Sequence, residues 1–229
     1  MRTIGVLGGM GPQATIDFEA RVHAAAQEVV PRHLNEGYPP MVTLYLRHAP
    51  VLVEEDGTPQ QPLKLDPRVL DAAAQLGRWA DILVMVSNTS HMFLDKIRAM
   101  AGCEVLSIVD VTVEELRRRG KGPVGLVGMG APQVYVERLE QEGFEVHMPI
   151  RHLRDRLDNA ILRMMEGTTT AEHRGAARAA IGSVRNAGAV ATVLGCTEIP
   201  LLLGDSADAE DLVNPAELLA QAAVRRATE

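Results

Sequence analysis

Cysteine is scarce in this chain. Its 229 residues include two, Cys103 and Cys196, so one disulfide is the most it can form. This excludes the small secreted folds that depend on several disulfides, and a reducing compartment would keep both residues as thiols. A cysteine that stands in a recognisable motif therefore needs a chemical explanation.

Positive charge and long apolar runs are also lacking. Lys and Arg number 23 against 30 Asp and Glu, a formal net charge of −7, which disfavours a nucleic-acid partner. Apolar stretches such as 82–86 are far shorter than the roughly 18 residues that cross a bilayer. The first apolar run is broken at Gly8, unlike the continuous core of a signal peptide. We expect a cytoplasmic protein with no membrane partner.

Several catalytic signatures are missing as well. The seven histidines are scattered, and the spacing of His147 and His152 does not match a zinc site. The sequence has neither a G-x-S-x-G elbow nor a G-x-x-x-x-G-K-[ST] phosphate loop. Metal enzymes, hydrolases with that elbow and nucleotide kinases are therefore disfavoured, and we expect no metal.

Short apolar, β-branched runs alternate with stretches of helical period, which indicates an α/β fold with parallel strands. The predicted strands are 3–7, 42–46, 82–86, 105–108, 124–127, 145–148 and 190–194. The predicted helices are 14–29, 70–79, 92–100, 111–119, 134–142, 153–165, 171–187 and 215–227. The irregular segment 47–67 contains four prolines and is long enough to be a lid or binding loop.

An internal repeat divides the chain. GVLGGMGPQ at 5–13 resembles GLVGMGAPQ at 125–133, and polar strand ends follow in each half, SNT at 87–89 and GCTE at 195–198. Parallel sheets present ligands at the carboxyl ends of their strands. The repeat therefore predicts two similar α/β units that face each other across a ligand cleft.

Each motif has more than one interpretation. GMGPQA at 9–14 fits a permissive dinucleotide fingerprint. However, the predicted second strand is followed by Arg47 rather than by the acidic residue that binds ribose in NAD sites. The motif also fits an NADP site, another anion site, or a tight turn without a ligand. Residues 87–91 suit a polar site in the cleft, although a helix cap would also favour Ser, Asn and Thr here. Cys196 precedes a predicted helix start, whose dipole would lower its pKa from about 8.5, although it is also compatible with an inert buried thiol.

TIGVLGGMGP at 3–12, NTSH at 88–91 and LGCTEIPLLL at 194–203 resemble the aspartate/glutamate racemase family, within the Asp/Glu/hydantoin racemase superfamily. The resemblance implies two flavodoxin-like lobes related by pseudo-twofold symmetry, with the active site in the cleft between them. It also implies a homodimer and a reaction without a cofactor. We place the first lobe at 1–103, completed by the C-terminal helix 209–229, and the second lobe at 104–208.

Racemisation without pyridoxal phosphate requires one acid–base group on each face of Cα. In the family, one cysteine begins a Cys-Asn-Thr motif and the other lies in Gly-Cys-Thr. Matched motif to motif, the second is Cys196, whereas Ser87 stands at the first. The hydroxyl of Ser87 is a much weaker acid than a thiol. Three explanations are open: a natural variant in which a neighbour such as Ser90 or His91 assists Ser87, an enzyme that uses a single thiol, or an engineered replacement.

The resemblance also assigns the residues that bind substrate. The neutral donors are Met10, Gly11, Asn88, Thr89 and Thr197, and Arg47 is the candidate for a side-chain carboxylate. His91 is a candidate proton relay, and Glu198 would orient a neighbour or tune Cys196, whose pKa its charge would raise. Many family members carry a lysine where Glu166 stands here, one turn after Arg163.

The leading hypothesis is a racemase of aspartate or glutamate that uses Cys196 and Ser87. The first alternative is a lyase or cis-trans isomerase that acts on a dicarboxylate through Cys196 alone. A catalytically impaired protein that only binds its substrate is another alternative, and a dinucleotide-dependent oxidoreductase is the least favoured. The expected partner in the first three is a small dicarboxylate or amino acid.

Overall fold

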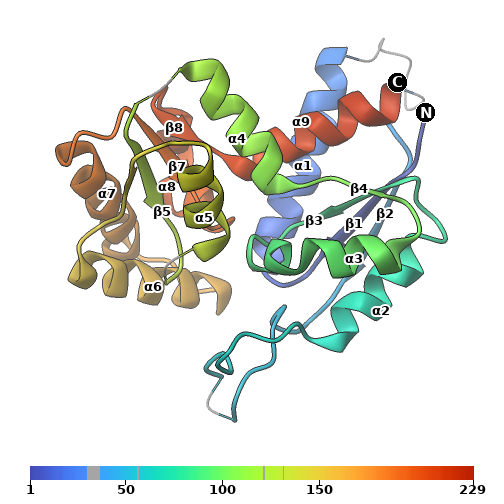
Figure 1. Ribbon diagram of the computed structural model, residues 1–229, viewed down its shortest axis with the longest axis horizontal. Coiled ribbons are helices and arrows are strands. Elements are labelled where there is room, and N and C mark those ends of the chain that lie inside the picture. Colours follow the sequence, from blue (N-terminus) through green and yellow to red (C-terminus); the bar gives the residue numbers. More distant parts are fainter. Residues whose placement is uncertain (30–36, 56, 121, 131) are drawn as a thin grey trace. The chain divides into compact units, whose positions relative to one another are not determined.

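The computed structural model describes residues 1–29, 37–55, 57–120, 122–130 and 132–229. The chain divides into two compact units (Figure 1). Unit 1 comprises Met1–Ile108 and Ala216–Glu229, and unit 2 comprises Val109–Pro215. Asp56 in the irregular segment and Ala131 in the second repeat lie outside the described residues.

Unit 1 is built on a four-stranded parallel sheet in the order β2-β1-β3-β4. Its strands are β1 (Ile4–Gly8), β2 (Met41–Tyr45), β3 (Ile82–Met85) and β4 (Glu104–Val105). Its helices are α1 (Pro12–Val29), α2 (Pro67–Leu76), η1 (Thr89–Phe93), α3 (Leu94–Ala101) and α9 (Pro215–Thr228). The central strands β1 and β3 are wholly buried, as expected for parallel strands covered on both faces.

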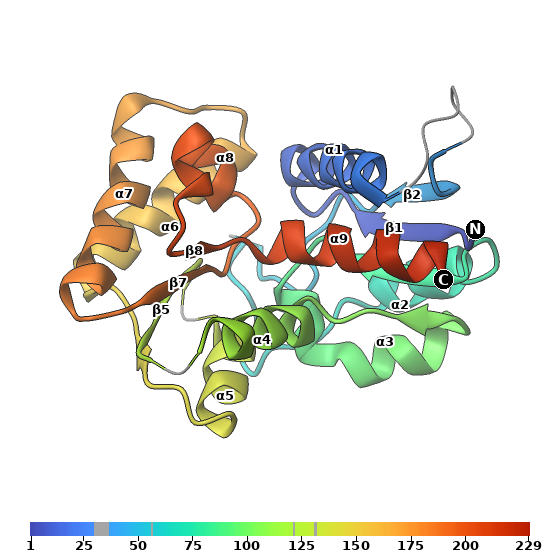
Figure 2. The ribbon, with the colours of Figure 1, turned by 90° about the horizontal axis from the view of Figure 1, so that it is seen from above.

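Unit 2 repeats this arrangement with the sheet order β6-β5-β7-β8, again all parallel. Its strands are β5 (Val124–Val127), β6 (Val146–His147), β7 (Ala191–Leu194) and β8 (Leu212–Val213). Its helices are α4 (Ile108–Arg119), α5 (Gln133–Gln141), α6 (Arg151–Met165), α7 (Ala171–Asn186), α8 (Ile199–Leu203) and η2 (Gly204–Asp208). Helices α6, α7 and α8 share one apolar core with β5 and β7, and Figure 2 shows these three helices side by side.

The predicted α/β class with two parallel-sheet units is confirmed. The predicted strand 105–108 is wrong at its end, because β4 stops at Val105 and Ile108 is already the first residue of α4. Residues 105–109 are apolar apart from Ser107, so hydrophobicity alone does not mark the change of backbone. The short strand β8 is not among the predicted strands, and α8 corresponds to the helix start expected after Cys196.

The irregular segment 47–67 contains antiparallel bridges and is therefore not a structureless loop. Bridges join Val51 to Leu65 and Val53 to Pro59, and the Leu52 N–H donates to the Lys64 carbonyl oxygen at 2.9 Å. In Figure 1 this bridged segment projects from unit 1 beyond α2. Within the described ranges, no helix has both the length and the apolar character of a membrane span.

Candidate functional site

Equivalent strand ends carry Ser87 in unit 1 and Cys196 in unit 2. The Val86 N–H donates to the Leu7 carbonyl oxygen at 3.0 Å, and the Gly195 N–H donates to the Val127 carbonyl oxygen at 2.6 Å. In each unit this bond joins the end of the first central strand to the residue before the candidate acid–base group. The repeat seen in the sequence is thus also a repeat of hydrogen bonding.

The first glycine turn is fixed by close packing. Gly9 has φ +81°, and a Cβ there would lie 2.7 Å from Cα of Tyr45. The Thr15 hydroxyl accepts from the Gly9 N–H at 2.8 Å and donates to the Gly11 carbonyl oxygen at 3.0 Å. Glycine is therefore required at position 9 by the backbone geometry itself.

The strand end of unit 1 brings several predicted site residues together. Ser87 and Asn88 are buried, and the Ser87 hydroxyl accepts a long hydrogen bond of 3.4 Å from the Ser90 N–H. The Ser90 hydroxyl lies 3.8 Å from the sulfur of Met10 in the glycine turn. These contacts place the polar residues after β3 beside the turn after β1.

The remaining predicted binding residues of unit 1 lie near the same edge of its sheet. Thr89 begins η1, directly after the buried pair Ser87 and Asn88. Arg47 is exposed and follows the end of β2 by two residues. The neighbouring Leu46 N–H donates to the Gly8 carbonyl oxygen at 2.8 Å, which ties this segment to the glycine turn.

His91, the candidate proton relay, is buried with both ring nitrogens against the main chain. Its Nε2 accepts from the Ile108 N–H at 3.1 Å, so the ring proton belongs on Nδ1, which lies 2.9 Å from the Ser87 carbonyl oxygen. The ring therefore clamps the end of β3 to the start of α4. This geometry favours a structural role over proton transfer to the Ser87 hydroxyl.

We expect His91→Ala to lower the free energy of unfolding by about 2–4 kcal/mol, because it leaves two buried main-chain groups without this partner. Urea denaturation measures the change. His152→Ala is the control, because His152 is an exposed histidine on α6. An unchanged urea midpoint for His91→Ala would contradict the clamp.

The strand end of unit 2 holds a thiol against a buried carboxylate. The Cys196 thiol donates to Oε2 of Glu198 at 3.0 Å, and the Thr197 hydroxyl donates to the same oxygen at 3.0 Å. Main-chain N–H groups of Met129 and Glu198 donate to the Cys196 sulfur. Because Glu198 and Thr197 are both buried, bulk water competes little for these bonds. The hydroxyl proton of Thr197, a predicted substrate donor, is directed to Glu198.

The predicted lowering of the Cys196 pKa by a helix dipole is wrong. Burial raises the pKa of this thiol well above its ordinary value, and the negative charge of Glu198 raises it further. The helix that follows, α8, has five residues, so its dipole is small. Cys196 is therefore a protonated thiol at neutral pH, beside a carboxylate that can take its proton.

We expect Glu198→Gln to lower the pKa of Cys196, since the substitution removes the carboxylate charge that disfavours the thiolate. Alkylation by iodoacetamide at neutral pH should then be about tenfold faster, as for a fall of about one pKa unit. Glu172→Gln, an exposed position on α7, is the matched control. Slower alkylation of Glu198→Gln would show that Glu198 promotes the thiolate in the resting protein.

Sequence reasoning missed two contributors to the Cys196 site. Met129 supplies a main-chain N–H to the sulfur, and Asp158 of α6 accepts the Gly130 N–H at 2.9 Å. Burial raises the pKa of Asp158. The repeat marks Met129 as part of a turn, but no sequence signal links Asp158 to it, because α6 lies in a distant part of the sequence.

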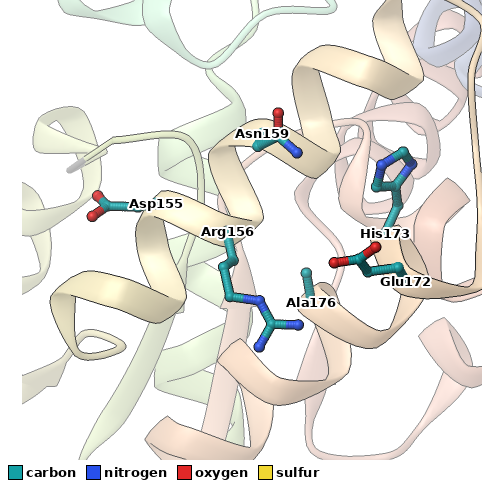
Figure 3. A pocket seen from close by; sticks show the side chains of 6 residues that line it. All are labelled: Asp155, Arg156, Asn159, Glu172, His173 and Ala176. Carbon is teal, nitrogen blue, oxygen red and sulfur yellow. The ribbon is translucent and has the colours of Figure 1, made fainter.

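A surface pocket of unit 2 lies between α6 and α7 (Figure 3). Its lining consists of Asp155, Arg156, Asn159, Glu172, His173 and Ala176, none of which is a predicted site residue. His173 is engaged in the cap of α7, where its Nδ1 accepts from the Thr170 N–H. Among the residues that the structure describes, no group of three His, Cys, Asp or Glu side chains is arranged to hold a metal ion.

Known proteins share both the sequence pattern and the fold. A family described as Asp/Glu/Hydantoin racemase matches residues 7–223. The broad specificity amino-acid racemase RacX of Bacillus subtilis is 27% identical over 146 residues, which span 62% of this chain and 63% of that protein. The chain thus spans less than two thirds of that relative.

Solved structures resemble the whole chain as well. The aspartate racemase of Picrophilus torridus has a TM-score of 0.82 at 19% identity, covering 100% of this chain and 95% of that one. A protein described as a putative Asp/Glu racemase from Yersinia pestis has a TM-score of 0.78 at 23% identity and full coverage of both chains. At these identities the likeness establishes the shared fold.

Proposed function

This chain belongs to the Asp/Glu/hydantoin racemase family, and from that premise we propose that it is a cofactor-independent amino-acid racemase. The observation that carries the proposal is the hydrogen bond from the Cys196 thiol to the buried Glu198 carboxylate. A thiol beside an internal proton acceptor suits a group that must both remove and return a proton.

The proposed reaction assigns Cys196 and Ser87 to opposite faces of Cα. Glu198 takes the thiol proton, and the resulting thiolate removes the proton from Cα. The Ser87 hydroxyl then donates its proton to the other face of the carbanion, which completes the inversion and leaves a Ser87 alkoxide. The proton held by Glu198 passes through water to this alkoxide, which restores Ser87 and Glu198, while Cys196 keeps the proton taken from Cα and is again a thiol. The reverse reaction runs through the same groups.

The Ser87 step sets the rate in this proposal. An alkoxide is far less stable than a thiolate near neutral pH, and each increment of about 1.36 kcal/mol in the barrier slows the reaction tenfold. The long contact from the Ser90 N–H, 3.4 Å, offers the developing alkoxide little stabilisation. We therefore expect slow turnover with Ser87 at this position.

Aspartate and glutamate are the first proposed substrates. Main-chain groups at Met10 and Gly11, together with Asn88 and Thr89, are the proposed donors to the α-carboxylate. Arg47 is the proposed partner of the side-chain carboxylate, and its exposure leaves its guanidinium available to a ligand.

A neutral amino acid is the competing substrate class. Glu166 stands where many family members carry a lysine, and it is ion-paired with Arg163 at 2.7 Å, which supplies no net positive charge. The match to a relative described as having broad specificity also supports this class. A homodimer, which the family resemblance implies, and a cytoplasmic location are further parts of the proposal.

The second candidate function is a single-thiol lyase or cis-trans isomerase of a dicarboxylate. The raised pKa of Cys196 favours it, because a thiol that stays protonated can deliver a proton to a carbanion without a partner on the other face. Ser87 would then take no part in proton transfer.

Proton exchange at Cα separates these functions. The protein is incubated in D2O with each enantiomer of aspartate, glutamate and alanine, and the Cα proton is followed by NMR. Exchange with inversion supports the racemase and identifies the substrate class. Absence of exchange from all six contradicts it, and release of carbon dioxide from a malonate-type acid would then support the lyase.

A further inference from the structure

The two units use equivalent main-chain N–H groups differently. Counting from the hydrogen-bonded strand ends, Leu7 corresponds to Val127, so Gly9 corresponds to Met129 and Thr15 to Tyr135. In unit 1 the Gly9 N–H donates to the Thr15 hydroxyl at 2.8 Å. In unit 2 the Met129 N–H donates to the sulfur of Cys196.

The change from threonine to tyrosine explains this difference. Tyr135 is fully buried on α5, and its hydroxyl is hydrogen-bonded to Thr112. It therefore does not take the place of the Thr15 hydroxyl in holding the turn. The Met129 N–H is left for the sulfur, but the second turn loses the anchor that α1 gives the first.

Asp158 supplies the anchor of the second turn. Its Oδ1 accepts from the Gly130 N–H at 2.9 Å. Asp158 lies on α6, whereas the Thr15 hydroxyl that holds the first turn lies on α1. The turn also touches the strand that carries Cys196, since a Cβ on Gly128 would lie 2.9 Å from the Gly195 carbonyl oxygen. A displacement of the turn would therefore change the position of the Met129 N–H relative to the sulfur.

We propose that Asp158 is a positioning residue of the Cys196 site: its carboxylate holds the Gly130 N–H and thereby directs the Met129 N–H at the sulfur. The donated hydrogen bond stabilises the thiolate form that proton transfer requires. The importance of this residue for turnover rests on the proposed function, whereas its effect on the thiol does not.

The test measures the thiol itself, without substrate. In a full-length Cys103→Ala background, the rate of Cys196 alkylation by iodoacetamide is followed as a function of pH by mass spectrometry. Asp158→Ala removes the acceptor and the charge, and Asp158→Asn removes the charge but keeps an oxygen that can accept the Gly130 N–H. Asp155→Asn is the matched control, an exposed aspartate one turn earlier on α6, labelled in Figure 3.

We expect Asp158→Ala to raise the pKa of Cys196 and to slow alkylation at neutral pH about fivefold, the effect of losing one hydrogen bond of about 1 kcal/mol. Asp158→Asn and Asp155→Asn should alkylate at the parent rate. A merely structural role gives the opposite sign, because loosening unit 2 exposes the sulfur and speeds alkylation.

Unchanged or faster alkylation of Asp158→Ala overturns the proposal. If that variant does not fold, Asp158→Glu replaces it, since the longer side chain keeps the charge and displaces the acceptor by one methylene. The same slowing is then expected, and an unchanged rate overturns the proposal. If the parent protein catalyses no Cα exchange, the proposed function is contradicted, but the effect of Asp158 on the alkylation rate of Cys196 is not.

Discussion

Cys196→Ala should abolish Cα proton exchange in every substrate that the parent protein accepts. The substitution removes the thiol that donates to the buried carboxylate of Glu198. Loss of a general acid–base group typically costs between a hundredfold and ten-thousandfold in rate, so we expect a decrease of at least about a thousandfold. NMR in D2O measures the rate of exchange, and circular dichroism with urea denaturation confirms that the protein is folded.

Cys103→Ala is the matched control for this experiment. Cys103 lies in unit 1, partly buried, immediately before β4, and its pKa is raised by burial and by the neighbouring Asp81. This substitution should leave the exchange rate unchanged. Retention of exchange in Cys196→Ala, with normal unfolding, would remove Cys196 from the reaction and with it both proposed functions.

The fold could be predicted well from the sequence where each element is long or wholly buried. The run 82–86 of apolar residues identifies β3 because a buried parallel strand is apolar on both faces. The same criterion fails at residues 105–108, where a largely apolar stretch begins in the two-residue strand β4 and ends in α4. It fails again at β8, whose two residues give no period to detect.

The candidate site could be predicted in its positions but not in its electrostatics. The motif that contains Cys196 shows that Glu198 is two residues away. The direction of the Cys196 pKa shift, however, depends on burial of the thiol, which raises the pKa, and on the short length of α8, which limits the opposing effect of the helix dipole. His91 is similar: its position in the motif does not reveal that Ile108, 17 residues later, occupies its Nε2. These effects arise from tertiary contacts.

The two strand ends are chemically unequal despite their common geometry. Cys196 has a carboxylate acceptor and a main-chain donor, whereas at Ser87 the equivalent main-chain donor, the Gly9 N–H, is taken by Thr15. The residue two positions after Ser87 is Thr89, in place of Glu198. Proton transfer should therefore be faster on the face of Cα that Cys196 serves.

Ser87→Cys should raise the rate of racemisation by at least about tenfold, equivalent to about 1.36 kcal/mol in the barrier. A thiol with an ordinary pKa of about 8.5 ionises far more readily than a hydroxyl, so the slower face would gain a competent acid–base group. Initial rates of inversion, measured from each enantiomer by NMR in D2O, quantify the gain.

Two further variants make the result decisive. Ser90→Cys places a thiol three residues along the same motif, at a buried position in contact with Met10, and should give no gain. Ser87→Ala should abolish inversion while leaving exchange from the enantiomer whose Cα proton faces Cys196. If Ser87→Cys brings no increase and Ser87→Ala retains the parent activity, Ser87 takes no part in proton transfer. The single-thiol reaction would then be the better account of this chain.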